Sequence, residues 1–294
     1  MNWLDDLPEG VCRRDVPLGP LTWFQIGGPA DYLVEPRNDG ELADVVRRCR
    51  DNETPLRVLG LGANVLVPDE GVRGVVVRLS ARAFTETRFD GEVVVTGAGV
   101  DMTKLVRTCV RRGLAGVEPL AGIPGTVGGG ISMNCGGRFG DISTAVSDIQ
   151  TIDSDGRSHR RGREDLHFGY RSCTLGKDWV TSAAFRLKRT DPETLSNRFR
   201  EILAYKQASQ PALGVQSVGC IFRNPNGHSA GQLIDRAGLK GFRMGSAQVS
   251  ERHANFAIAD RGGRASDVRN LIRTITDRVF DESGIHLDPE VKIW

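Results

Sequence analysis

Glycine-rich segments are the feature of this 294-residue chain whose residue types and spacing could do chemistry. The densest one reads Pro119-Leu120-Ala121-Gly122-Ile123-Pro124-Gly125-Thr126-Val127-Gly128-Gly129-Gly130, which holds more glycines than a turn needs and no lysine. Missing side chains expose consecutive backbone N–H groups, and such nests bind phosphate oxygens. The segment therefore predicts a phosphate or dinucleotide site, and the alternative is an ordinary glycine-rich loop.

Two predicted strands end in the shorter pattern Gly-x-Gly, at Gly60 to Gly62 and at Gly97 to Gly99. The dinucleotide fingerprint G-x-G-x-x-G is not completed, because Val65 and Met102 stand at its last position. A Rossmann fold is therefore disfavoured, and no lysine-containing P-loop is present either. Both segments could simply be tight turns after strands.

Composition excludes several classes of function. The chain has 39 basic and 37 acidic residues and a net charge of +2, which gives little electrostatic attraction to nucleic acid. None of the six cysteines lies within three residues of another, and the five histidines form no H-x-H or H-E-x-x-H pattern, so we expect no metal site. No apolar run is long enough to span a membrane, and residues 1–6 do not read as a signal peptide, so we expect a cytoplasmic protein.

The elements that must position the glycine segments follow from periodicity. Asn38 and Glu41 read as a capping box before a helical face that ends at Cys49, and strands are expected at 56–59 and 74–79. A second unit begins with a strand at 93–96, and Asp101 caps the helix that follows it, which has Cys109 on its apolar face. Strand, helix and strand at short spacing favour an α/β or α+β unit.

The main domain boundary is expected near Asp191-Pro192, which reads as an N-cap followed by proline at the first helical position. Beyond it we expect a capping box at Ser229 and Gln232, a strand at 256–259, and a helix from Ser266 that Gly284 ends. The predicted organisation is therefore two subdomains at 1–80 and 81–190, and a C-terminal domain at 191–294.

Six segments together resemble the MurB family, the UDP-N-acetylenolpyruvoylglucosamine reductases of peptidoglycan and cell-wall synthesis. They cover nearly the whole chain in the right order, and six matches are far more specific than one. The segments are Phe24-x-Ile26-Gly27-Gly28-Pro29-Ala30, 60–67, 122–129 with Met133-Asn134, Gly169-Tyr170-Arg171, 219–225 and 287–291.

The resemblance implies an α+β protein: an FAD-binding fold of the vanillyl-alcohol-oxidase type in two subdomains, with an α+β C-terminal domain over the substrate. This fold does not use the Rossmann fingerprint. The chain is similar to the shorter class of the family, which lacks an extra inserted loop. By family position, the FAD-binding residues would be Gly60, Leu61, Gly62, Ala63, Asn64, Val65, Pro119, Gly122, Ile123, Pro124, Gly125, Thr126, Val127, Gly128, Gly129 and Asn134.

The reaction that the resemblance implies is the NADPH-dependent reduction of UDP-N-acetylglucosamine enolpyruvate to UDP-N-acetylmuramate. Arg171 would hold the enolpyruvyl carboxylate as enolate charge grows. Cys220 stands where the family usually has serine, and a thiol, with a reference pKa of about 8.5, gives up a proton more readily than a hydroxyl. Glu290 would donate to the enol carboxyl or orient it. The alternatives are that Arg171 is an ordinary surface arginine, that Cys220 is an inert buried cysteine, and that Glu290 is a solvated carboxylate.

Tyr170, Arg223, Asn224 and His253 would contact the substrate, although His253 could equally be structural. The resemblance implies a cytoplasmic enzyme, expected to be a monomer, with no nucleic-acid or membrane partner. Two rivals remain: another flavin oxidoreductase of the same fold, and a non-catalytic protein that binds flavin or a sugar nucleotide. The presence of Arg171, Cys220 and Glu290 together argues against the second rival.

Overall fold

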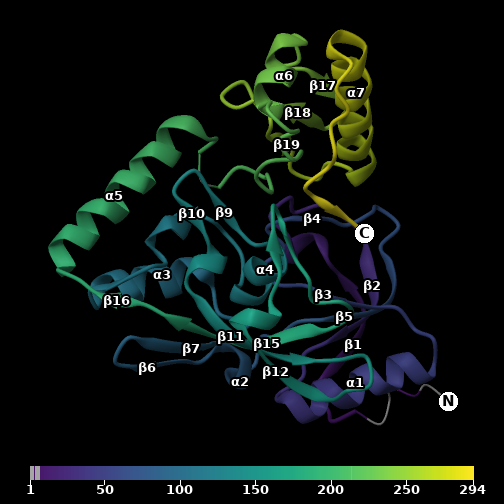
Figure 1. Ribbon diagram of the computed structural model, residues 1–294. Helices are drawn as coiled ribbons and strands as arrows, with labels where there is room; N and C mark the ends of the chain where they lie inside the picture. The colour runs from purple at the N-terminus through teal and green to yellow at the C-terminus, as the bar shows by residue number, and fades with distance from the viewer. Residues whose placement is uncertain (1–2, 4–6, 213) are drawn as a thin grey trace. The chain divides into compact units, whose positions relative to one another are not determined.

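The computed structural model of the chain describes residues 3, 7–212 and 214–294 (Figure 1). The chain forms two compact units: unit 1 is Met1–Arg14, Tyr32–Leu61 and Arg73–Tyr205, and unit 2 is Asp15–Asp31, Gly62–Val72 and Lys206–Trp294. The division at 80/81 and 190/191 expected from the sequence stays a prediction. Residues 1, 2 and 4–6, which belong to the stretch that does not read as a signal peptide, lie outside the described residues.

Unit 1 contains a five-stranded antiparallel sheet with the order β12-β11-β15-β7-β6. Its strands are β6 (Thr87–Asp90), β7 (Val93–Gly97), β11 (Val146–Ile152), β12 (Ser158–Gly162) and β15 (Trp179–Arg186). A second sheet has the order β1-β2-β5-β3, and the unit boundary falls within three of its strands. These strands are β1 (Cys12–Pro17), β2 (Pro29–Val34), β3 (Leu56–Val58) and β5 (Val72–Val77).

Short strand pairs complete the β-structure of unit 1. Each pair is antiparallel and joins two-residue strands: β8 (Leu114–Ala115) with β16 (Lys188–Arg189), β9 (Gly136–Gly137) with β10 (Gly140–Asp141), and β13 (Phe168–Gly169) with β14 (Ser172–Cys173). Single 3-10 turns lie at Glu118–Leu120, Ile142–Thr144 and Arg163–Asp165. The β13–β14 pair matters most below, because it carries a predicted catalytic residue.

Most helices of unit 1 begin at polar side chains, as local sequence dictates, whereas α2 begins after Ala81 without a side-chain cap. Asn38 Oδ1 accepts from Glu41 N at 3.0 Å, and Asp101 Oδ1 accepts from Thr103 N at 2.7 Å. The capping box predicted at Asn38 is only half formed, because the Glu41 carboxylate accepts from the Arg37 N–H instead, at 2.8 Å. The helices are α1 (Asp39–Asp51), α2 (Arg82–Thr85), α3 (Met102–Arg111), α4 (Val127–Ser132) and α5 (Pro192–Ser209).

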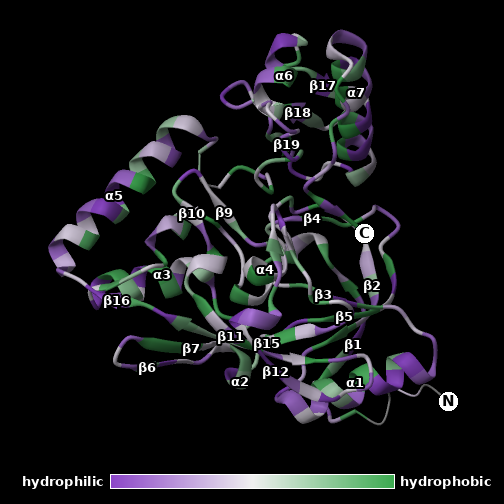
Figure 2. Ribbon diagram, viewed as in Figure 1, coloured by the Kyte–Doolittle hydropathy of each residue, from purple (hydrophilic) through white to green (hydrophobic). Residues whose placement is uncertain are grey.

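Unit 1 has its own hydrophobic core, in which the apolar faces of α1 and α3 are buried with the valine-rich strands. Cys49 and Cys109 belong to it, as predicted, and burial raises the pKa of both thiols to about 12. Figure 2 shows mostly hydrophobic residues along β5 and β7, whereas α5 is largely hydrophilic. Only Leu195 and Ile202 of α5 are buried.

Unit 2 has a separate core around α7 (Ala265–Ser283), whose buried stripe matches the sequence prediction from Val268 to Val279. Gly284 ends this helix in the left-handed conformation, with φ 68°. Helix α7 contacts α6 and two strands of an antiparallel sheet with the order β17-β18-β19. The elements are α6 (Ala230–Arg236), β17 (Arg243–Met244), β18 (Ala247–Val249), β19 (Ala257–Ala259), β4 (Val65–Leu66), β20 (Lys292–Ile293) and a 3-10 turn at Gly19–Leu21.

The start of α7 is held by a residue far away in sequence. Asp69 accepts from the Ala265 N–H at 2.6 Å and from the Ser266 N–H at 3.0 Å, which satisfies two amides of the first helical turn. Burial raises the pKa of Asp69, but hydrogen bonds from the Ser266 side chain and from these two amides hold it below its usual value. Parallel pairing of β20 with β4 adds a second link between Gly62–Val72 and the C-terminal segment.

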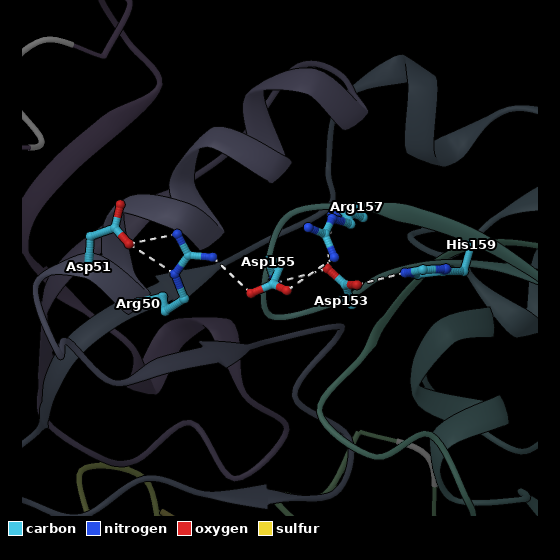
Figure 3. Close-up of polar contacts among 6 residues, drawn as sticks. All are labelled: Arg50, Asp51, Asp153, Asp155, Arg157 and His159. Carbon is cyan, nitrogen blue, oxygen red and sulfur yellow. Dashed lines mark hydrogen bonds and ion pairs between the residues drawn. The ribbon is translucent and has the colours of Figure 1, made fainter.

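A polar network surrounds the turn between β11 and β12 in unit 1 (Figure 3). The Asp153 carboxylate accepts from the backbone N–H groups of Asp155 and Arg157, both at 2.8 Å, and it pairs with His159 Nε2 at 2.6 Å. Arg50, at the end of α1, donates to Asp155 at 2.8 Å. The turn is therefore fixed internally by Asp153 and tied to α1 by Arg50.

No helix in the described ranges is long and apolar enough to cross a lipid bilayer. Nor does any group of three or more His, Cys, Asp or Glu residues among the described positions have the arrangement to hold a metal ion.

Candidate active site

The glycine-rich segment of unit 1 is partly helical, which the sequence did not indicate. Thr126 caps α4 by accepting from Gly129 N at 3.3 Å, and Gly128–Gly130 lie inside the helix. The amide of Val127 donates to Val100 and that of Gly128 donates to Ala98. These three amides are used within the protein, so they do not form the open phosphate-binding nest that the sequence suggested.

The glycines serve close backbone approach instead. A Cβ on Gly128 would lie 2.9 Å from the Ala98 Cβ, and one on Gly60 would lie 2.5 Å from Thr126 Oγ1. Real side chains do not tolerate such contacts, so only glycine fits at these two positions. The fold thereby joins two predicted cofactor segments of unit 1, one around Gly60 and one around Thr126.

A tight hairpin in unit 1 presents Arg171. Strands β13 and β14 pair Phe168 with Cys173 and Gly169 with Ser172, which leaves Tyr170 and Arg171 as a two-residue turn. Arg171 has φ 55°, a left-handed conformation that costs a non-glycine residue about 1–2 kcal/mol. Strain of this kind gathers at functional sites, where the surrounding structure enforces it.

Asn134 connects this hairpin to the segment after α4. Its Nδ2 donates to Gly169 O at 3.0 Å, and the side chain is buried at 6% exposure. Its Oδ1 is buried and has no hydrogen-bond partner among the described residues. A buried polar atom without a partner is unusual in a native protein and calls for an explanation such as a bound molecule.

In unit 2 the fold brings together three predicted site residues that are distant in sequence. The Glu290 N–H donates to the carbonyl of Ile221, next to Cys220, at 2.6 Å. Asn64 Nδ2 donates to Glu290 O at 3.3 Å, and Lys292 N donates to Asn64 O at 3.0 Å. The candidate acid Cys220 and the candidate carboxyl group Glu290 are therefore on paired backbone segments.

Asn255 is a buried residue that sequence reasoning missed. It is 3% exposed, accepts from Phe222 N at 2.9 Å and donates to Phe222 O at 2.8 Å, so its amide pairs with both backbone groups of that residue. Its own carbonyl accepts from Ile221 N at 2.9 Å. Asn255 therefore fixes the two residues that follow Cys220. An asparagine immediately before the strand expected at 256–259 was the only signal in the sequence.

His253 lies next to this framework. Its Nδ1 accepts from Asn255 N at 3.2 Å, which places the proton of a neutral ring on Nε2. Burial lowers the pKa of His253, and the charge of Lys240 lowers it further. His253 is therefore a neutral Nε2–H donor near pH 7.

Arg223 and Asn224 are each held by a hydrogen bond to the backbone of another residue. The Arg223 N–H donates to Asp288 O at 2.9 Å, while its Nε is buried without a partner among the described residues. Asn224 Oδ1 accepts from Ala230 N at 3.0 Å, at the start of α6. The side-chain oxygen of Asn224 thus has a hydrogen-bond partner within the protein, whereas the Nε of Arg223 can donate to a ligand.

Comparison with known proteins decides the family. Residues 210–294 match the C-terminal domain of UDP-N-acetylenolpyruvoylglucosamine reductase, and residues 30–162 match an FAD binding domain. The chain is 41% identical to the reductase of Syntrophobacter fumaroxidans over 99% of this chain and 86% of that protein. It is also 41% identical to that of Heliobacterium modesticaldum, over 97% and 91% of the two chains. The chain belongs to the UDP-N-acetylenolpyruvoylglucosamine reductase (MurB) family.

Solved structures support the same assignment. The MurB of Thermus caldophilus superposes with a TM-score of 0.84 at 38% identity, covering 96% of this chain and 99% of that one. The glucose dehydrogenase Phl p 4.0202 has a TM-score of 0.51 at 16% identity, which bears on the fold alone. The predicted α+β class, with an FAD-binding fold of the oxidase type and a MurB C-terminal domain, is confirmed.

As a MurB, the protein is an FAD-dependent oxidoreductase, and unit 1 fits this cofactor. Gly60 and Gly128 allow the backbone to approach Thr126 and Ala98 closely, which holds the predicted cofactor segments of unit 1 together. Gly122 and Gly125 adopt φ 71° and 125°, conformations that favour glycine. The buried Asn134 Oδ1 supplies an acceptor for a bound N–H or O–H group.

The predicted catalytic residues of this MurB fall in both units. Arg171, Tyr170 and most of the cofactor segments belong to unit 1, whereas Cys220 and Glu290 belong to unit 2. The run from Gly60 to Val65 was expected to be one FAD-binding segment. Its first two residues belong to unit 1 and the rest, from Gly62, belong to unit 2. In unit 2 a Cβ on Gly62 would lie 2.5 Å from Leu21 O, so this glycine also serves a close backbone contact.

Proposed function

We propose that this MurB reduces UDP-N-acetylglucosamine enolpyruvate to UDP-N-acetylmuramate with NADPH, in the cytoplasm and as a monomer. The observation that carries the reaction is the similarity to curated reductases over nearly the whole chain. Supporting it within the molecule, the backbone pairing of Glu290 with Ile221 brings the candidate acid and carboxyl segments together.

Bound FAD would supply the redox chemistry, accepting a hydride from NADPH and delivering it to the terminal enolpyruvyl carbon. Gly60, Thr126 and Gly128 would hold the cofactor in unit 1. The further cofactor residues that we propose are those of the sequence prediction: Leu61, Gly62, Ala63, Asn64, Val65, Pro119, Gly122, Ile123, Pro124, Gly125, Val127, Gly129 and Asn134.

Arg171 would bind the enolpyruvyl carboxylate. A guanidinium offers two parallel N–H donors to a carboxylate, and its charge stabilises the enolate that develops during reduction. The left-handed backbone of Arg171 supports this role, because a strained turn presents the side chain in one direction.

Cys220 would protonate the carbon next to the enol carboxylate, and Glu290 would orient that carboxylate or share the proton transfer. Gly219 precedes Cys220 with φ 88°, and a Cβ there would meet no atom within 4 Å, so the backbone before the thiol borders open space. Asn255 fixes Ile221 and Phe222 directly after it. A general acid held this way is worth on the order of 10²- to 10⁴-fold in rate.

Arg223, Asn224, Tyr170 and His253 would contact the rest of the substrate. The Arg223 Nε donor suits the diphosphate, since guanidinium groups pair well with phosphate oxygens. His253 would donate through neutral Nε2–H, a hydrogen bond that suits a sugar hydroxyl or carbonyl oxygen. Tyr170 is 55% exposed and available to pack on a ligand.

A steady-state assay tests this function. The purified protein should be yellow, release one FAD per chain on denaturation, and oxidise NADPH only when the enolpyruvyl substrate is added. Initial rates should give parallel double-reciprocal lines, because nicotinamide and enolpyruvyl carbon use the same flavin atom in turn. FAD that stays on the denatured chain, with no turnover of the enolpyruvyl substrate, would point to a different flavin oxidoreductase. Bound ligand without any turnover would point to a binding protein.

A further inference from the structure

We propose that Asn134 is a positioning residue for Arg171, acting through the carbonyl of Gly169. This inference rests on the proposed role of Arg171. The family resemblance implied Asn134 only as a cofactor residue.

The contact that carries the proposal is the 3.0 Å hydrogen bond from Asn134 Nδ2 to Gly169 O. Gly169 is the last residue of β13 before the turn that contains Arg171. Its carbonyl begins that turn, so its direction sets the peptide plane leading to Tyr170 and Arg171. A side chain that holds this carbonyl therefore controls the position of the Arg171 backbone, from which the guanidinium group extends.

The orientation of the Asn134 amide is settled by chemistry. Gly169 O is an acceptor only, so the amide group facing it must be the NH₂ end. The opposite end, Oδ1, is then the buried atom with no partner among the described residues. Asn134 thus donates to the Arg171 turn with one end and keeps an acceptor for a bound molecule with the other.

The backbone of Asn134 supports the same interpretation. Asn134 has φ 41°, a conformation that asparagine tolerates better than most side chains. It lies one residue beyond Met133, the C-cap of α4, and its N–H donates to Ile131 O at 3.0 Å. Two left-handed residues, Asn134 and Arg171, are therefore linked by one side-chain hydrogen bond to Gly169.

The experiment compares the two half-reactions of the FAD-loaded enzyme by stopped flow. Asn134→Gly removes the side chain and keeps a backbone that accepts φ 41°. Reoxidation by the enolpyruvyl substrate should fall on the order of 10²-fold, since a small misplacement of a positioned group costs that much, and it should fall by at least about tenfold more than flavin reduction by NADPH does. Glu53→Gly is the matched control, because Glu53 is exposed in unit 1 and has φ 49°. It should change neither rate.

A double-mutant cycle separates positioning from a general structural effect. In an Arg171→Ala background, whose own reoxidation should be slow by about 10²- to 10³-fold, Asn134→Gly should cost less than threefold more. An equal loss in both backgrounds would overturn the proposal. If Arg171→Ala reoxidises at the wild-type rate, the proposed role of Arg171 fails instead, which distinguishes the two failures.

Two further measurements decide the case in which Asn134→Gly binds FAD poorly. In Asn134→Asp the carboxylate keeps the shape but loses the donor, so reoxidation should be slow near pH 8. Because burial beside the Gly169 carbonyl oxygen favours the neutral acid over the carboxylate, reoxidation should recover toward pH 5 as the O–H returns. Amide hydrogen exchange in 168–173 should be at least about tenfold faster in the loaded Asp variant than in wild type at pH 8, with α1 unchanged. A pH profile and exchange pattern equal to those of wild type would overturn the proposal.

Discussion

Thr126 Oγ1 lies 2.5 Å from the point at which a Cβ on Gly60 would stand. The same Thr126 oxygen caps α4 through Gly129 N, so it cannot move away without loosening the helix start. Gly60 begins the predicted cofactor segment that follows β3, whereas Thr126 lies within the glycine-rich run. Their close approach links these two predicted cofactor segments of unit 1.

Gly60→Ala should therefore weaken FAD binding. A methyl group forced into this contact costs about 1–3 kcal/mol, which corresponds to a rise of about 5- to 150-fold in the FAD dissociation constant if the strain falls on the loaded state. Titration of the apoprotein with FAD, followed by flavin fluorescence, measures it. Gly137→Ala is the control, because Gly137 is exposed and a Cβ there meets no atom within 4 Å. Equal affinities for both variants would contradict the prediction.

Cys220→Ala should leave FAD binding and reduction by NADPH intact, because the role that we propose for the thiol comes after hydride delivery. Reoxidation by the enolpyruvyl substrate should fall by about 10²- to 10⁴-fold, the usual worth of a general acid. Cys220→Ser should recover part of the loss, since a hydroxyl can take the same place and donate. Stopped-flow absorbance separates the two steps.

Alkylation provides an independent check on Cys220. It should mimic the alanine variant, and bound substrate should protect against it. Alkylation of Cys49 or Cys109 is not expected in the folded protein, because both thiols are buried and their pKa values are raised to about 12. If Cys220→Ala reoxidises as fast as wild type, the proton comes from Glu290 or water.

His253 should make folding stability depend on pH near neutrality. Burial lowers its pKa in the folded protein, so below about pH 6.5 the unfolded chain takes up a proton that the folded one refuses. Stability should therefore fall as the pH drops from 7 toward 5, and His253→Gln should flatten this slope. Urea midpoints at several pH values measure it, with His286→Gln removing an exposed imidazole of unit 2 as the control. Equal slopes in wild type and His253→Gln would refute it.

Asp153 should contribute stability that acid removes. The Arg157 amide and the His159 ring lower the pKa of this carboxyl group to about 2 in the folded protein. Its contribution is present above the ordinary value of about 3.9 and is lost as the pH falls toward 2. Asp153→Asn should be less stable than wild type at pH 6, with the gap closing between about pH 4 and pH 2. Amide hydrogen exchange at residues 153–159 (Figure 3) measures the stability of this turn directly. A difference in stability between wild type and Asp153→Asn that did not change with pH would contradict the prediction.

Much of the fold was predictable because it depends on neighbours in sequence. Asp101 caps α3 two residues ahead, and Asp191 Oδ2 accepts from Thr194 N at 2.7 Å at the start of α5, as the sequence indicated. The buried stripe of α7 follows from helical periodicity. Helix α4 was not predicted because glycine is a poor helix former. Its stability comes from packing and from the hydrogen bonds that its backbone amides donate to Ala98 and Val100.

The sequence by itself determined the local elements, the family and the types of residue available for chemistry. Only the tertiary structure decided which of them meet: that Gly62–Val72 joins the C-terminal segment in unit 2, that Glu290 pairs with Ile221, and that Asn134 reaches Gly169. The physical reason is the distance along the chain between the interacting residues. Caps and periodic faces involve residues a few positions apart, whereas these contacts join groups far apart in the chain, whose polar atoms find partners only when the core has formed.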